Sequence, residues 1–177
     1  LLSVSGLVPV KRVHLIPKAL AQTQRDIIWT HIGDGGCRVE VENAAAKLGD
    51  NVTVRLAGQK THTEVLQHYL DEPVDLFINV SSSEGLPVSI MEAFSFGVPT
   101  IATAVGGSPE IVTRSCGYHL PPDFEPAQLA SLLEKHDLDD QILRAGALEM
   151  QHIEYSSIRN QASFAAEIHV AMQRKLD

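Results

Sequence analysis

The stretch Asp75-Leu76-Phe77-Ile78-Asn79-Val80 decides the fold, because it is almost continuously apolar and is bounded by polar residues. Such a run is typical of a strand buried on both faces of a parallel sheet. From Pro87 onward the apolar positions recur at helical spacing, with Pro87 in the first turn, and Gly97 ends the pattern. We therefore expect a buried strand, then a polar loop that carries Glu84, then a helix whose second turn carries Glu92.

Glu84 and Glu92 point to a site that binds hydroxyl groups. Open α/β sheets bind ligands at the carboxyl ends of their strands. A helix start there offers unpaired N–H groups and partial positive charge to a phosphate, and carboxylates accept hydrogen bonds from sugar hydroxyls. Pro87 has no N–H, so the expected donors are the amides of Leu86, Val88 and Ser89. The alternative is that Glu84 only caps the helix and Glu92 is an exposed surface residue.

Strand and helix patterns alternate along the chain before a purely helical end. The expected strands are residues 1–5, 27–32, 52–57, 75–80, 100–104 and 117–120. The expected helices between and after them are residues 13–20, 38–48, 63–70, 126–136, 141–150 and 164–176. This order predicts one α/β domain over residues 1–177, with a Rossmann-like, doubly wound parallel sheet.

The composition of the chain excludes several classes of partner. The net charge is −8, whereas nucleic acids and anionic membranes require a basic face, so we expect no nucleic acid partner and no direct membrane contact through this domain. No apolar stretch approaches the roughly 20 residues that span a bilayer. Cys37 and Cys116 are isolated and are expected to be free thiols.

No metal site is expected. The eight histidines lack the spacing of zinc ligands. Asp137-Leu138-Asp139 superficially matches an Asp-x-Asp metal motif, but it lies in the late helical region, where an acidic helix start is the better interpretation.

Four motifs follow one another in a characteristic order. They are Asp75-Leu76-Phe77, Ser83-Glu84-Gly85-Leu86-Pro87, Glu92-Ala93-Phe94-Ser95-Phe96-Gly97-Val98-Pro99 and Gly106-Gly107-Ser108-Pro109-Glu110-Ile111-Val112. This series resembles the donor-binding domain of retaining glycosyltransferases of family 4. The resemblance extends upstream to Leu7-Val8-Pro9-Val10-Lys11-Arg12 and Ile32-Gly33-Asp34-Gly35, and downstream to residues 116–122. It implies the GT-B fold, in which two Rossmann-like domains face each other across a cleft.

The resemblance also assigns roles to particular residues. Glu84 would accept hydrogen bonds from the transferred sugar, the amides of residues 85–89, starting at Gly85, would meet sugar and phosphate oxygens, and Glu92 would bind the ribose. Lys11 and Arg12 would meet the diphosphate, so that Glu84 and Lys11 are the catalytic candidates. The family usually has an Arg five positions before this Lys, but Gly6 stands here.

Three glycine turns follow strands of the predicted sheet. The resemblance places the nucleobase near Gly33 and residues 57–59, although a sharp turn after a strand needs glycine in any case. For Gly106-Gly107 we expect a structural turn, with Ser108 as the N-cap and Pro109 as the first helical residue.

The resemblance implies a retaining, metal-independent transferase that moves a sugar from a nucleotide-diphosphate sugar to a glycan or glycolipid acceptor, as in polysaccharide biosynthesis. This chain would be its C-terminal donor-binding half, inactive alone, with the acceptor site in an N-terminal domain absent from the sequence. We expect a cytoplasmic enzyme, with peripheral attachment to a membrane as a variant. The alternatives are a sugar-nucleotide-binding module without activity, and a GT-B epimerase or hydrolase.

Overall fold

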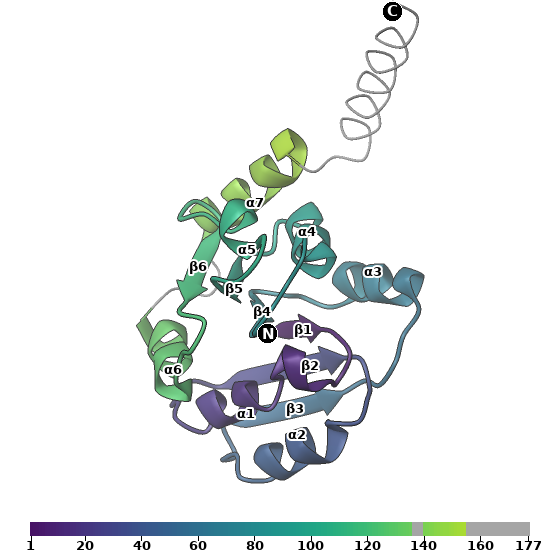
Figure 1. Ribbon diagram of the computed structural model, residues 1–177, viewed down its shortest axis with the longest axis vertical. Helices are drawn as coiled ribbons and strands as arrows, with labels where there is room; N and C mark the ends of the chain where they lie inside the picture. Colours follow the sequence, from purple (N-terminus) through teal and green to yellow (C-terminus); the bar gives the residue numbers. More distant parts are fainter. Residues whose placement is uncertain (136–139, 155–177) are drawn as a thin grey trace, which may run out of the picture.

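The computed structural model describes residues 1–135 and 140–154, in which six parallel strands form one sheet (Figure 1). The strands are β1 (Leu2–Val4), β2 (Ile27–Ile32), β3 (Val52–Leu56), β4 (Phe77–Asn79), β5 (Thr100–Thr103) and β6 (Gly117–Leu120). Their order is β3-β2-β1-β4-β5-β6. This is the order of a doubly wound sheet, so the predicted Rossmann-like α/β fold is confirmed.

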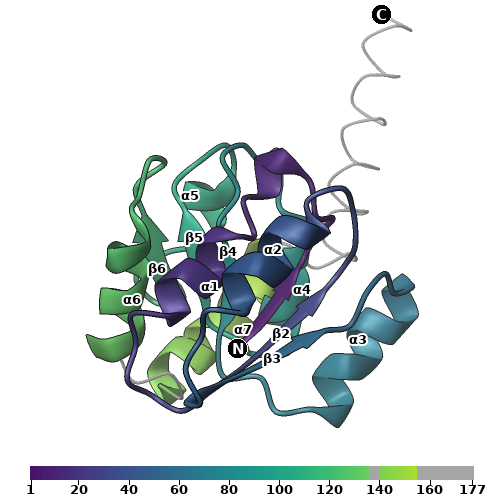
Figure 2. The ribbon, with the colours of Figure 1, turned by 90° about the horizontal axis from the view of Figure 1, so that it is seen from below.

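Helices cover both faces of the sheet (Figures 1 and 2). They are η1 (Pro9–Lys11, a 3-10 turn), α1 (Leu15–Leu20), α2 (Arg38–Ala45), α3 (His62–Asp71), α4 (Val88–Ser95), α5 (Ser108–Ile111), α6 (Pro126–Lys135) and α7 (Gln141–Glu154). In Figure 2, α1 lies between α2 and α6, and both contact it. α3, α4, α5 and α7 pack on the opposite face.

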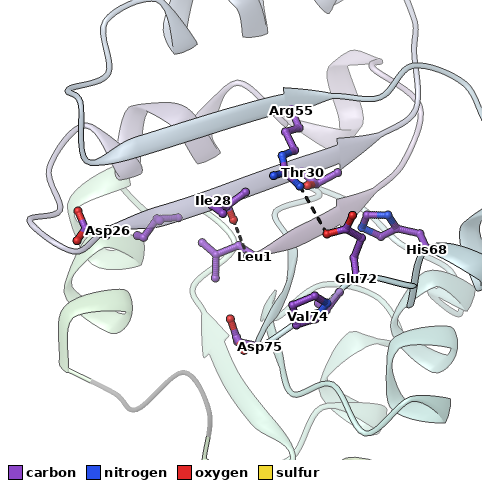
Figure 3. A pocket seen from close by; sticks show the side chains of 11 residues that line it. Leu1, Asp26, Ile28, Thr30, Arg55, His68, Glu72, Val74 and Asp75 are labelled. Atoms are coloured by element: carbon purple, nitrogen blue, oxygen red, sulfur yellow. Dashed lines mark hydrogen bonds and ion pairs between the residues drawn. The ribbon is translucent and has the colours of Figure 1, made fainter. Parts of the chain in front are cut away.

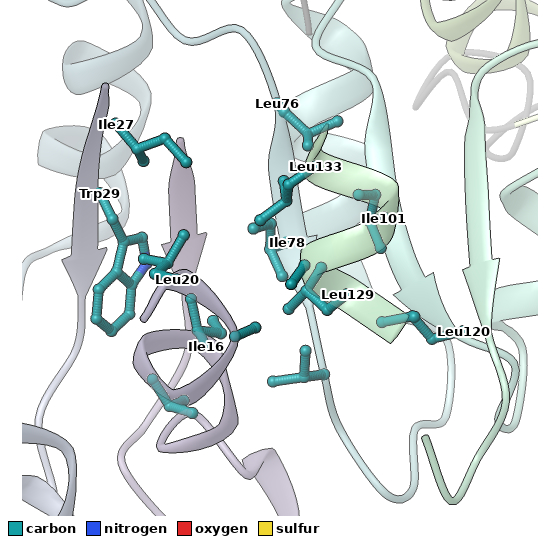
Figure 4. Close-up of a cluster of buried hydrophobic side chains, with 14 of the residues drawn as sticks. Ile16, Leu20, Ile27, Trp29, Leu76, Ile78, Ile101, Leu120, Leu129 and Leu133 are labelled. Carbon is teal, nitrogen blue, oxygen red and sulfur yellow. The ribbon is translucent and has the colours of Figure 1, made fainter. Parts of the chain in front are cut away.

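The side chains between the sheet and its helices form two separate apolar cores, one on each face of the sheet. On the first, Ile16 and Leu20 of α1 meet Ile78 of β4 and Leu129 of α6 (Figure 4). On the second, Phe77 of β4 packs with side chains of α3, α4 and α5. Neighbouring residues of β4 therefore enter opposite cores, as expected of a strand buried on both faces.

Several helix boundaries differ from the predictions. Pro87 is the N-cap of α4, in an extended conformation, and not part of its first turn. α2 ends at Ala45 rather than continuing to residue 48. Gly107, not Ser108, is the N-cap of α5, and the buried hydroxyl of Ser108 has no hydrogen-bond partner, so the predicted side-chain cap is wrong. The predicted helix over residues 164–176 and the Asp137-Leu138-Asp139 motif lie outside the described residues.

Both cysteines are free, as predicted, with Cys116 buried and Cys37 partly exposed. No helix in the described ranges is both long enough and apolar enough to cross a bilayer.

A chain of buried hydrogen bonds joins β1 to β2. Trp29 Nε1 donates to Ser3 Oγ at 3.0 Å, and Ser3 Oγ lies 2.8 Å from His31 Nδ1. His31 Nε2 lies 3.1 Å from the carbonyl oxygen of Ser5, which can only accept, so Nε2 carries the proton. Every side-chain polar group in this hydrogen-bond network is satisfied when His31 is neutral, and burial lowers the pKa of His31 to about 4.

This network predicts a loss of stability in mild acid. Between pH 6.5 and about 4 the unfolded chain binds a proton at residue 31 that the folded chain does not, so the free energy of unfolding falls as pH decreases through this window. The full effect is about 3 kcal/mol. Denaturant unfolding at several pH values should show it, and His31→Gln should flatten the pH dependence by that amount. Equal slopes for the two proteins would contradict the assignment.

Candidate functional site

Lys11 and Glu84, 73 residues apart in sequence, meet at the carboxyl edge of the sheet. Lys11 ends η1, which follows β1, and Glu84 lies on the loop after β4. The chain runs from β1 outward to β3 and then crosses back to β4, so this is the topological switch point at which doubly wound sheets bind ligands. Lys11 Nζ lies 2.7 Å from Glu84 Oε1.

The Glu84 carboxylate is held in its ionised form. Its side chain is only 9% exposed, and this burial acts to raise the pKa of Glu84. Hydrogen bonds from Lys11, Ser81 and Asn79 outweigh burial, so the pKa of Glu84 lies below its usual value. Asn79 Nδ2 donates to the same oxygen as Lys11, at 3.0 Å. The result is a fixed, charged acceptor beside a cation.

The Gly106-Gly107 turn packs directly against the backbone of Glu84 and Gly85. Gly107 N donates to the Gly85 carbonyl oxygen at 3.0 Å. Gly106 has a φ of +52°, and a Cβ there would collide with the Glu84 carbonyl. The turn is structural, as predicted, and its function is to fix the loop that carries Glu84.

The amide donors expected at the start of α4 lie on the same loop. Gly85, Leu86 and Val88 are exposed and Ser89 is partly exposed. The backbone hydrogen bonds of the described residues leave the N–H groups of Leu86, Val88 and Ser89 without a carbonyl acceptor. These donors are therefore available to an anion at a helix N-terminus.

Arg12 is built into the scaffold. Its φ of 47° is left-handed. Its guanidinium donates to the carbonyl oxygens of Val80 (2.9 Å), Ser81 (3.1 Å) and Pro122 (2.8 Å), and it lies 5.3 Å from the centre of the Phe124 ring. Diphosphate binding by Arg12 stays a prediction, and these contacts weigh against it. Lys11 is the better placed of the two cations.

Glu92 lies on the second turn of α4, as predicted, but it is not a fully exposed residue. Its side chain is 17% exposed, and Glu92 Oε1 lies 2.8 Å from His62 Nε2, at the start of α3. The sequence analysis missed His62, because nothing in its own neighbourhood indicates a partner on another helix.

Glycines shape the edge beside β1 and β2. Gly33 N donates to the Gly58 carbonyl at 2.8 Å, and a Cβ on Gly33, whose φ is 139°, would collide with the Ser5 carbonyl. Contact of either glycine with a nucleobase stays a prediction. At Gly6 a Cβ would meet only the Asp34 carbonyl oxygen, at 3.8 Å, so the backbone has room for a side chain there.

A cavity of about 270 Å³ lies at the opposite, amino end of the strands (Figure 3). Leu1, Ile28 and Val74 line it together with the ion pair of Arg55 and Glu72, which is 3.6 Å long. It contains none of the predicted site residues. We identify the candidate site by its charges and hydrogen-bond donors, which occupy an open edge rather than an enclosed cavity. In the described ranges, no three His, Cys, Asp or Glu side chains are grouped so as to hold a metal ion.

Fold and edge together define a Rossmann-like α/β domain with anion-binding groups at its topological switch point. The sequence model of the family "Glycosyl transferases group 1" matches residues 1–149, and the chain belongs to this family.

Curated relatives agree with this assignment. The chain is 32% identical over 111 residues to the amylovoran biosynthesis glycosyltransferase AmsK of Erwinia amylovora, covering 59% of this chain and 27% of AmsK. It is 25% identical over 174 residues to the putative colanic acid biosynthesis glycosyltransferase WcaL of Salmonella typhimurium, covering 91% of this chain and 43% of WcaL. The chain thus spans less than half of each of these relatives.

Solved structures share the fold. HepE of Anabaena, crystallised in complex with UDP, aligns with a TM-score of 0.78 at 21% identity, over 96% of this chain and 48% of HepE. The C-terminal domain of a glycosyl transferase group 1 protein (LpcC) from Francisella tularensis aligns with a TM-score of 0.71 at 19% identity, over 88% and 86% of the two chains.

A pair of glycine variants tests how the loop is held. Gly106→Ala should lower the free energy of unfolding by about 1–3 kcal/mol, because it forces a left-handed Ala against the Glu84 carbonyl. Gly85→Ala is the control, since a Cβ at Gly85 meets nothing within 4 Å. Urea denaturation measures both, and equal stabilities would show that the turn does not fix the loop.

Proposed function

We propose that this chain is the donor-binding domain of a retaining, metal-independent glycosyltransferase. The full-length enzyme would transfer a sugar from a nucleotide-diphosphate sugar to a glycan or glycolipid acceptor bound by another domain. The observation that carries the proposal is the ion pair of Lys11 and Glu84 beside the amides of the α4 start, at the switch point of the sheet. The UDP complex of HepE supports a nucleotide sugar as the donor, and the names of AmsK and WcaL, which refer to the biosynthesis of amylovoran and of colanic acid, support a glycan as the product.

The charged groups at this edge suit the two charges that develop in the reaction. Glycosyl transfer develops positive charge at the anomeric carbon and negative charge on the departing phosphate. Lys11 donates one N–H to Glu84 and has two more, which can meet the diphosphate together with the amides of Leu86, Val88 and Ser89. This cationic edge neutralises the leaving group without a metal ion.

Glu84 would serve as a hydroxyl acceptor rather than as a nucleophile. Its carboxylate already accepts hydrogen bonds from Lys11 and Asn79, which fix its orientation and reduce its nucleophilicity. Its remaining lone pairs can receive sugar hydroxyls. As the bond between the anomeric carbon and the phosphate oxygen breaks, the acceptor hydroxyl would attack on the same face of the sugar and pass its proton to the departing phosphate, which would retain the anomeric configuration.

The cellular location that we propose for the full-length enzyme follows from its proposed substrates. Nucleotide sugars are cytoplasmic metabolites, so the full-length enzyme would act in the cytoplasm, with peripheral attachment to a membrane when the acceptor is a glycolipid. The chain alone would bind the donor weakly and transfer nothing, because the acceptor site lies elsewhere.

Two substitutions test the nucleotide assignment by isothermal titration calorimetry. Glu92→Ala should weaken UDP about tenfold or more, because it removes charge-assisted hydrogen bonds to the ribose. Lys11→Ala should weaken UDP more than UMP, since it removes a cation from the diphosphate. Glu149→Ala, a matched change at an exposed position of α7, is the control and should bind as the parent does. Unchanged UDP affinity in both variants, with unchanged circular dichroism, would overturn the proposal.

A second candidate function is a sugar-nucleotide-binding module without transfer activity, and Gly6 is the observation that favours it. The Arg that the family usually places here is missing, although the backbone has room for its side chain. Gly6→Arg should strengthen UDP binding about three- to tenfold and leave uridine unchanged, because a guanidinium adds charge-assisted hydrogen bonds to phosphate. If Gly6→Arg leaves UDP affinity unchanged, position 6 does not face the diphosphate. Turnover by the full-length protein distinguishes the transferase from the module.

A further inference from the structure

The contact between His62 and Glu92 joins two helices that are not adjacent in sequence. His62 is the first residue of α3, and its side chain is 69% exposed, whereas that of Glu92 is 17% exposed. The carboxylate is thus largely enclosed, and the imidazole reaches it from outside. Among the described residues, Glu92 forms its ion pair with His62.

The backbone of α3, which carries His62, is held in place by two sets of contacts. A capping box fixes the start of α3: Glu64 N donates to Thr61 Oγ1 at 3.3 Å, and Thr61 N donates to Glu64 Oε2 at 2.8 Å. Further along α3, the Tyr69 ring stacks on Phe96, at the end of α4, with ring centres 4.8 Å apart and planes 4° from parallel. The start of α3 is therefore fixed, and α3 is packed against the end of α4.

The contact leaves the carboxylate able to bind a ligand. A carboxylate oxygen has two lone pairs, so Oε1 can accept from His62 and still accept from a hydroxyl, and Oε2 adds further capacity. A free glutamate must give up side-chain rotamer freedom when it binds a ligand. A glutamate already held by His62 has lost much of that freedom before the ligand arrives.

We propose that His62 is a positioning residue for the nucleotide: it holds Glu92 in the orientation that receives the ribose hydroxyls. This inference rests on the proposed function, which assigns the ribose to Glu92. His62 acts through Glu92 and need not touch the nucleotide itself.

The test compares variants of the chain by calorimetry with UDP and with 2′,3′-dideoxy-UDP. His62→Ala should weaken UDP about two- to tenfold, the equivalent of ordering one flexible side chain on binding. It should not affect the dideoxy nucleotide, which lacks the hydroxyls. His62→Gln, which retains an N–H donor, should recover most of the loss. In a Glu92→Ala background, His62→Ala should have no further effect.

His152→Ala, the same change at an exposed position of α7, is the matched control. Equal UDP affinity for His62→Ala and the parent, with a loss for Glu92→Ala, would overturn this inference and leave the proposed function standing. An equal loss for UDP and the dideoxy nucleotide would show a general structural role and would also overturn it. If Glu92→Ala binds UDP as the parent does, the ribose assignment itself fails, and the inference fails with it.

Discussion

The pairing of β1 with β4 at the centre of the sheet is the constraint on which the rest of the structure depends. Leu2 of β1 lies opposite Phe77 of β4, and both side chains are fully buried. Because all strands are parallel, the loops that leave these two strands emerge at one edge. That single pairing brings Lys11 to Glu84 and creates the switch point between the two halves of the sheet.

The edge is a local electrostatic feature in an acidic molecule. With a net charge of −8, the domain as a whole does not attract anions, so a phosphate must be bound by groups placed within hydrogen-bond distance of it. Lys11 and the α4 amides are such groups. Arg12 and the Gly106-Gly107 turn contribute differently: they hold the backbone of the loop after β4, whereas the side chains of Lys11 and Glu84 pair with each other at the edge.

Much of the fold could be predicted from the sequence, because its signals are local. A buried parallel strand is recognisable as an apolar run, and this located all six strands to within a few residues. The placement of Glu92 on the second turn of α4 followed from helical spacing. The helix starts were less accurate: Pro87 and Ser108 suit a first turn and an N-cap by residue type, yet the backbone of the preceding loop shifts each by one position.

The contacts that define the site could not be predicted in this way, because they join distant segments. Arg12 looked like a free cation, but its guanidinium reaches the carbonyl of Pro122, 110 residues later. The partner of Glu92 is an otherwise unremarkable histidine on α3. Such contacts depend on how whole elements pack, and residue type and spacing contain no information about that.

The most direct test of the central claim is an NMR titration of the isotope-labelled chain with UDP, following backbone amide shifts. If the edge between β1 and β4 is the donor site, the largest changes should map to Lys11, to residues 84–86, 88 and 89, and to the start of α3. Changes concentrated instead around Arg55, His68 and Glu72, at the amino end of the sheet, would place the nucleotide in the 270 Å³ cavity and contradict the claim.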